Sequence, residues 1–194
     1  MPLSIEMVTF CNSWLAKADS YGGDELNDYY NKAFSLFTLY NRLYAEATFT
    51  LARDGQITLP NNKPFPDGRG AKEYGPQFIG YDTLMQVLND DDSCRTAINT
   101  LIHLIENEVF YIKLSMPHGD RQREKDEKLL QELKSSGTKT KITAILDFIY
   151  SVRCNMFHGN KGFNPIQIQL LNPMTVVLRK IIVTLFDKLQ NNPT

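Results

Sequence analysis

Apolar residues recur at helical spacing along most of the chain and predict the framework of the fold. From Asn27 to Leu51 they cover most of the circumference of a helix, which is typical of a helix at the centre of a bundle. Between Ala97 and Ile112 they recur at three- and four-residue steps, Val109 among them, with Ser93 as the predicted N-cap. Two core helices are therefore expected in the first 112 residues.

Four further segments are predicted to be helical. Tyr81–Leu88 is short, and Asp120–Lys134 is a mixed-charge helix with three leucines as its apolar contacts. Thr143–Phe157 is the next core helix. Met174–Leu189 is expected to begin after a break at Asn172-Pro173, because proline seldom continues a helix.

The segment 54–77 interrupts this pattern with prolines, glycines and asparagines, and only Gln56–Leu59 resembles a short strand. A loop of this length is unusual in a compact bundle, so it is either an ordered lid or a flexible excursion. We therefore predict an all-α fold: an antiparallel helical bundle of about five to seven helices with a long inserted loop. Residues 1–194 would form a single domain.

Composition narrows the functional classes. The formal net charge is -1 and the pI is about 6.3, so contact with nucleic acid would require a local patch. The three cysteines are widely spaced without a CxxC pair, which favours reduced thiols over disulfides or a zinc site. The N-terminus lacks a signal-peptide pattern, and no continuous apolar stretch reaches the ~18–20 residues of a membrane span. A cytoplasmic protein without membrane contact is expected.

One arginine conflicts with the apolar pattern. Arg153 falls inside the apolar stripe that begins at Ile142, where a guanidinium must be paired, hydrated or functional. His158 follows five residues later, about 140° around an ideal helix at ~100° per residue. Unwinding at Gly159, or pairing with a second copy across a two-fold axis, would bring the two side chains together.

The string RCNMFHGNK, residues 153–161, resembles the signature of the HEPN superfamily (higher eukaryotes and prokaryotes nucleotide-binding domains). That signature has an arginine, four to six residues and then a histidine at the end of a late bundle helix. The helix around residues 37–44 also resembles the early helix of such proteins. Cys154 stands where the family usually has a polar residue.

The resemblance implies a function. HEPN proteins are commonly homodimers, and many are metal-independent endoribonucleases in bacterial toxin–antitoxin, phage-defence or RNA-processing systems. Carried over, Arg153 and His158 would be catalytic, with Asn155, Cys154 and Lys161 in supporting or substrate-binding roles. The products would be 2′,3′-cyclic phosphate and 5′-hydroxyl ends, without a cofactor or metal. RNA, a second copy and an antitoxin or other protein are the implied partners.

Other interpretations stay open. The chain would alternatively be a catalytically inactive HEPN module that binds a nucleotide, RNA or a protein partner. In a purely structural scaffold, Arg153 would form a buried salt bridge and His158 would cap its helix. Cys154 beside an arginine is also a possible thiolate nucleophile. No metal-ligand spacing is found around His103 or His118.

Overall fold

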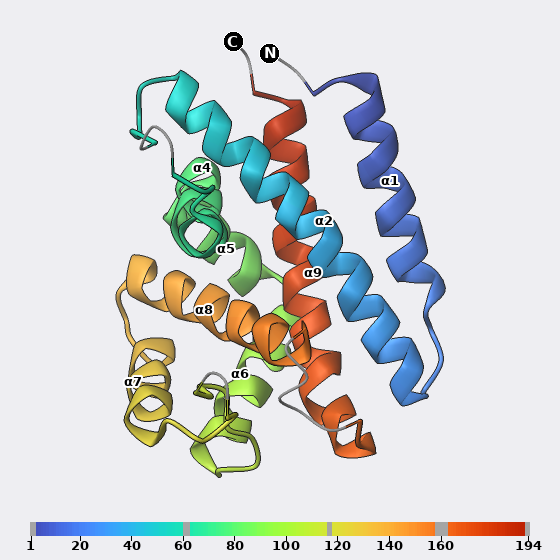
Figure 1. Ribbon diagram of the computed structural model, residues 1–194, viewed down its shortest axis with the longest axis vertical. Helices are drawn as coiled ribbons and strands as arrows, with labels where there is room; N and C mark the ends of the chain where they lie inside the picture. The colour runs from blue at the N-terminus through green and yellow to red at the C-terminus, as the bar shows by residue number, and fades with distance from the viewer. Residues whose placement is uncertain (1–2, 60–62, 116–117, 158–162, 193–194) are drawn as a thin grey trace.

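A computed structural model describes residues 3–59, 63–115, 118–157 and 163–192 (Figure 1). Across these ranges the chain is helical and forms no β-strand. A lone antiparallel bridge joins Leu114 to Arg121. The prediction of an all-α bundle is therefore confirmed.

Most of the helices follow one another closely, but longer connections span residues 54–66 and 107–122, and two of the segments are single turns of π- or 3₁₀-helix. In chain order they are α1 (Ile5–Ser20), α2 (Leu26–Arg53), α3 (Asp67–Arg69), η1 (Gly70–Tyr74), α4 (Gly75–Ile79), α5 (Tyr81–Asp90), α6 (Asp92–Glu106), α7 (Arg123–Leu133), α8 (Thr138–Phe157), η2 (Pro165–Gln167) and α9 (Ile168–Gln190).

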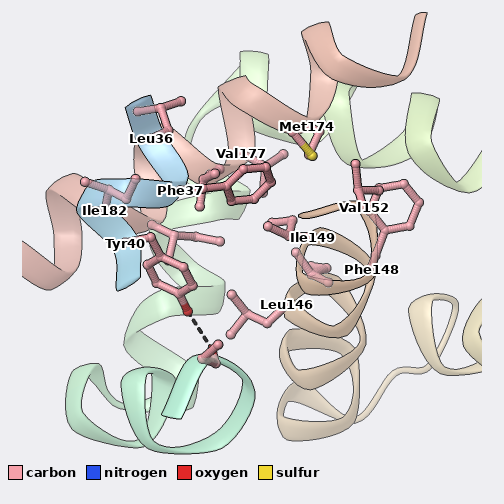
Figure 2. Close-up of a cluster of buried hydrophobic side chains, with 14 of the residues drawn as sticks. Leu36, Phe37, Tyr40, Leu146, Phe148, Ile149, Val152, Met174, Val177 and Ile182 are labelled. Atoms are coloured by element: carbon pink, nitrogen blue, oxygen red, sulfur yellow. Dashed lines mark hydrogen bonds between the residues drawn. The ribbon is translucent and has the colours of Figure 1, made fainter. Parts of the chain in front are cut away.

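The core lies where α2, α8 and α9 meet. Figure 1 shows α1, α2 and α9 along the long axis, with α8 running transverse to them and ending near α9. In Figure 2, Phe37 of α2 and Val177 of α9 lie opposite Ile149 of α8, and all three side chains are buried. Removing such side chains from water is the main stabilising contribution, at about 25 cal/mol per Å² of apolar surface. This core, together with the packing of α8 against α5, α7 and η1, fixes the position of α8 and therefore of Arg153.

Helix α6 differs from its prediction at both ends. Its N-cap is Asp91 rather than Ser93, because the Asp91 carboxylate accepts the backbone N–H of Cys94 at 3.0 Å. The helix also ends before Glu108, which has a positive φ of 54°. Val109 therefore lies exposed beyond the helix, and its predicted place in the apolar stripe is wrong.

Helix α9 begins earlier than predicted, because Pro173 lies inside it. Pro173 stands in the second turn, where its missing N–H removes a single bond to the first turn of the helix. The neighbouring Met174, Val177 and Leu178 are fully buried, so packing maintains the helix through this residue. The predicted break at Asn172-Pro173 is wrong.

Within the described ranges, one helical stretch, Pro165–Gln190, is long and apolar enough to cross a membrane, which the sequence analysis did not anticipate. Half of its apolar window is buried inside the bundle. A core helix of a soluble protein has the same length and composition, so this stretch by itself assigns the chain to no compartment.

Much of the predicted loop is ordered. The cover segment, residues 67–79, forms α3, η1 and α4 and packs against α2 and α8. Figure 2 shows its anchor: the buried Tyr40 hydroxyl of α2 donates to the Ala71 carbonyl at 2.6 Å. A Cβ at Gly70 would lie 3.0 Å from the Tyr44 ring, so glycine permits this close approach. This part of the predicted loop is therefore ordered and packed.

Candidate functional site

Helix α8 carries Arg153 at the edge of its buried stripe. The preceding turns bury Ile142, Ile145, Leu146, Ile149 and Val152. The Arg153 side chain keeps 23% of its surface exposed, because it lies where α8 meets α2 and the cover segment. The predicted conflict between burial and charge is therefore present at Arg153. Polar groups from both neighbouring elements contact its guanidinium.

Two polar side chains contact the guanidinium of Arg153. Nη1 lies 3.3 Å from Oδ2 of Asp67 in the cover segment. Nη2 donates to the Asn41 amide oxygen of α2, also at 3.3 Å, in the amide orientation that satisfies all of its neighbours. Nε is buried and has no hydrogen-bond partner in the described parts of the chain. One donor of the fork is therefore unsatisfied.

Asp67 lies at the centre of this arrangement. The Tyr44 hydroxyl donates to its Oδ1, and the Tyr150 hydroxyl donates to Oδ2 at 2.9 Å. In the same orientation of its amide, Asn41 donates to the Tyr44 hydroxyl at 3.0 Å and so leaves the phenolic proton for Asp67. The Asp67 side chain is 42% exposed. Three donors thus converge on one carboxylate that solvent still reaches.

The electrostatics keep every donor protonated. Burial raises the pKa of Tyr44 and of Tyr150, and the hydrogen bond to Asp67 raises each further. Burial alone would lower the pKa of Arg153, but the charge of Asp67 and the nearby phenols together raise it above its ordinary value. The arrangement has the chemistry of an anion-binding site in which Asp67 supplies the anion.

Asn155 has a structural environment. It is buried, and its amide nitrogen donates to the backbone carbonyl of Ile112 at 2.9 Å. This bond fixes the segment after α6 against α8, and no contact with Arg153 is found in the described residues. Cys154 is a half-buried free thiol in the wall of a separate cavity. The predicted residues His158 and Lys161 lie outside the described residues.

An aromatic patch adjoins the Arg153 site. The Phe157 ring centroid lies 5.4 Å from Cζ of Arg153 and 5.6 Å from the Phe34 ring of α2. Tyr30 and Phe163 form a second ring pair at 5.0 Å. Phe34, Phe157 and Phe163 are all exposed, which is unusual for large apolar side chains. The site therefore combines a charged centre with an apolar edge.

The described residues contain no group of three or more His, Cys, Asp or Glu side chains able to hold a metal ion. His103 lies instead beside Asn107, whose amide nitrogen is 2.8 Å from its Nδ1. No metal site is assigned around this histidine.

Sequence reasoning missed the residues that surround Arg153. Asn41 and Tyr44 lie on the helix that resembles the early HEPN helix, and this resemblance was the available signal. Tyr150 stands three residues before Arg153, on the same face of α8. Asp67 had no signal, because it lies 86 residues from Arg153 in a glycine- and proline-rich stretch.

Comparison with known proteins adds no assignment to this site. No family model, curated protein or solved structure matches the chain. The functional assignment therefore depends on the chemistry of the side chains themselves.

Proposed function

We propose that the protein is a metal-independent endoribonuclease of HEPN type, in which Arg153 holds the scissile phosphate and His158 transfers protons. The supporting observation is that Arg153 lies among convergent donors around a solvent-accessible carboxylate, with its Nε unpaired in the described residues. A site that binds a carboxylate in this way suits a phosphate of similar charge and acceptor geometry.

In this proposal a phosphate of the RNA displaces Asp67 from the guanidinium. Arg153 then donates its planar fork to two phosphate oxygens and stabilises the charge that develops on them during the reaction. The Tyr150 hydroxyl, released from Asp67, becomes a further donor for the same anion. Arg153 and Tyr150 already lie side by side on α8, so the main rearrangement in this scheme is the displacement of Asp67.

His158 supplies the proton transfers in this scheme. It directly follows Phe157, the last described residue of α8, and imidazole has an unperturbed pKa of about 6.5. A base removes the 2′-hydroxyl proton, the 2′-oxygen bonds to phosphorus, and the bond from phosphorus to the 5′-oxygen breaks. An acid protonates the departing 5′-oxygen. The products are a 2′,3′-cyclic phosphate and a 5′-hydroxyl.

A homodimer is part of the same proposal. The exposed rings of Phe34, Phe157 and Phe163 offer an apolar surface next to Arg153. Pairing two copies there would bury these rings and bring two copies of His158 to one shared site, as base and as acid. A cytoplasmic bacterial toxin–antitoxin or phage-defence role, with an antitoxin as partner, follows from the resemblance alone.

A second candidate function is an inactive HEPN module that binds a nucleotide, RNA or a protein without cleaving RNA. The observation in its favour is that the Arg153 guanidinium is already ion-paired with Asp67. A carboxylate held by two tyrosines as well as the arginine neutralises the guanidinium and competes with phosphate. RNA would then bind weakly or leave Arg153 paired.

Incubating the purified protein with labelled RNA in EDTA distinguishes the two functions. The ribonuclease cleaves RNA to cyclic-phosphate ends, leaves the matching DNA intact and loses activity in Arg153→Ala and in His158→Ala. Arg179→Ala is the matched control, because Arg179 pairs with Asp19 on an exposed surface. Intact RNA with every substrate, or equal cleavage by all variants, would refute the proposal.

A further inference from the structure

A cavity of about 510 Å³ opens between α7, α8 and the stretch that follows α6. This volume falls within the roughly 300–1,000 Å³ of typical small-ligand sites. Tyr150 and Cys154 of α8 line it, so it adjoins the Arg153 site without containing Arg153. Apolar wall is provided by Ile112 and Leu129.

The charged groups in the wall are mostly positive. Lys72, Lys113, Lys125 and Lys128 face Asp147 and Glu132, so four lysines against two carboxylates leave an excess of two positive charges. This excess contrasts with the formal net charge of -1 for the whole chain. A cavity with an excess of one charge sign attracts ligands of the opposite sign.

The lysines are not all engaged. Asp147 binds both Lys113 and Lys72, the latter at 3.0 Å, so one carboxylate is shared by two ammonium groups. Lys113 also donates to the Ser151 hydroxyl at 2.8 Å. On α7, Lys128 lies 3.8 Å from Glu132, and Lys125 is exposed. Donors therefore remain for an anion at the mouth of the cavity.

One aromatic ring separates this cavity from the Arg153 site. The Tyr150 ring has Cζ of Arg153 at 5.4 Å from its centroid and Nζ of Lys72 at 5.6 Å. Two cations from different elements thus lie close to the same ring. A polyanion that lies along Tyr150 would be near both of them.

We infer that the cavity between α7 and α8 binds the phosphate of a nucleotide, with the lysines as donors and the apolar wall against the ribose or base. In its full form this inference rests on the proposed function, because the nucleotide is then the neighbour of the scissile phosphate in the same RNA strand. A free mononucleotide offers the same chemistry. The lysines recognise phosphate as point charges, without the planar geometry of an arginine.

The test uses Lys125→Glu/Lys128→Glu, because both side chains are exposed on α7 and neither is among the contacts of Arg153. Lys17→Glu/Lys188→Glu is the matched control, with the same charge change on exposed residues of α1 and α9. The probe is a short, fluorescent 2′-O-methyl RNA, which cannot be cleaved. We expect the α7 variant to bind it at least tenfold more weakly than the control. Its slope of log affinity against log salt should be shallower by about 1.4, or ~0.7 for each lost phosphate contact.

A calorimetric titration with adenosine monophosphate identifies the source of the phosphate. If wild type binds it and the α7 variant does not, the cavity takes free nucleotides; if only the RNA probe responds, it takes the strand. Equal RNA and nucleotide binding by the α7 variant and its control would overturn the inference. That result leaves the ribonuclease proposal intact if Arg153→Ala still abolishes cleavage. Conversely, lysine-dependent binding by a wild type that does not cleave RNA would keep the cavity site and refute the enzyme.

Discussion

Two carboxylates bind cations around α8, and they differ in how firmly they are held. Asp147, on α8 itself, binds Lys113 and Lys72 and is 22% exposed. Asp67 reaches Arg153 from the cover segment at 3.3 Å and is 42% exposed. The first joins three parts of the chain in a partly buried setting at the wall of the lysine-lined cavity, whereas the second is more open to water and to competing anions. The ion pairs of Asp147 can therefore stabilise the fold, whereas the ion pair between Asp67 and Arg153 can open to admit another anion.

The surroundings of Asp147 explain its firmness. Burial by itself would raise the pKa of Asp147, but the two lysines lower it further than burial raises it, so the carboxylate stays charged. Removing the charge would leave two ammonium groups facing each other in a partly buried space. Asp67 has neutral tyrosine donors as partners beside Arg153, so its removal leaves only one cation unpaired.

The largest expected effect is a loss of RNA cleavage when Arg153, the partner of the more exposed carboxylate, is replaced. Arg153→Lys keeps a positive charge for Asp67 but loses the planar fork that the proposed reaction requires. We expect kcat/KM for RNA cleavage to fall by about 10²–10³, as when one preorganised donor to a transition state is lost. Thermal unfolding should change little. Activity within threefold of wild type would show that the fork geometry has no catalytic role.

The next largest effect is a loss of stability when Asp147, the less exposed carboxylate, loses its charge. Asp147→Asn should lower the free energy of unfolding at pH 7 by about 2–3 kcal/mol, because it leaves Lys113 and Lys72 without their shared anion. Urea unfolding of both proteins measures this difference. Asp19→Asn is the matched control, since Asp19 forms an exposed pair with Arg179, and it should cost at most about 1 kcal/mol.

The same pair of proteins gives a pH dependence with a defined sign. The folded-state pKa of Asp147 is depressed, so its stabilising contribution is fully present above the unfolded value of about 3.9. It is lost as pH falls through the depressed pKa. The difference between wild type and Asp147→Asn should therefore be constant from pH 7 to about 5 and shrink below about 4. A difference that persists unchanged in acid would contradict this assignment.

A smaller effect, on RNA binding, is expected when the Asp67 carboxylate is neutralised. Asp67→Asn should tighten RNA binding about fivefold, because the repulsion between two anions some 4 Å apart in water is about 1 kcal/mol. Fluorescence anisotropy with the 2′-O-methyl RNA measures it. Weaker binding would mean that Asp67 orients Arg153 for the ligand and does not compete with it.

The smallest effect concerns the neighbouring thiol. Cys154→Ser should leave kcat/KM within about twofold, because the proposed chemistry forms no bond to sulfur. Cys154 contributes to the wall of the lysine-lined cavity, and serine preserves most of that shape. A loss of a hundredfold or more would restore the thiolate-nucleophile hypothesis, and trapping of a covalent adduct would then test it directly.

The sequence predicted the bundle because periodicity reports burial one helix at a time. It also identified Arg153, since a charge inside an apolar stripe is a local conflict. It could not identify Asp67, because a pairing across 86 residues leaves no periodic trace. Proline was misjudged in α9, where packing of the surrounding turns outweighs one missing hydrogen bond. Local rules thus predicted the elements, whereas the site depends on contacts between elements.

The attachment of the cover segment makes occupancy of Arg153 measurable at a distance. Besides Asp67 at its start, the segment is fastened at Ala71 by Tyr40 and at Lys72 by Asp147. An anion that takes the place of Asp67 would release only that corner, while the other two hold. Amide hydrogen exchange near Asp67 would then quicken while exchange at η1 stays slow, so the backbone itself would report when the arginine is occupied.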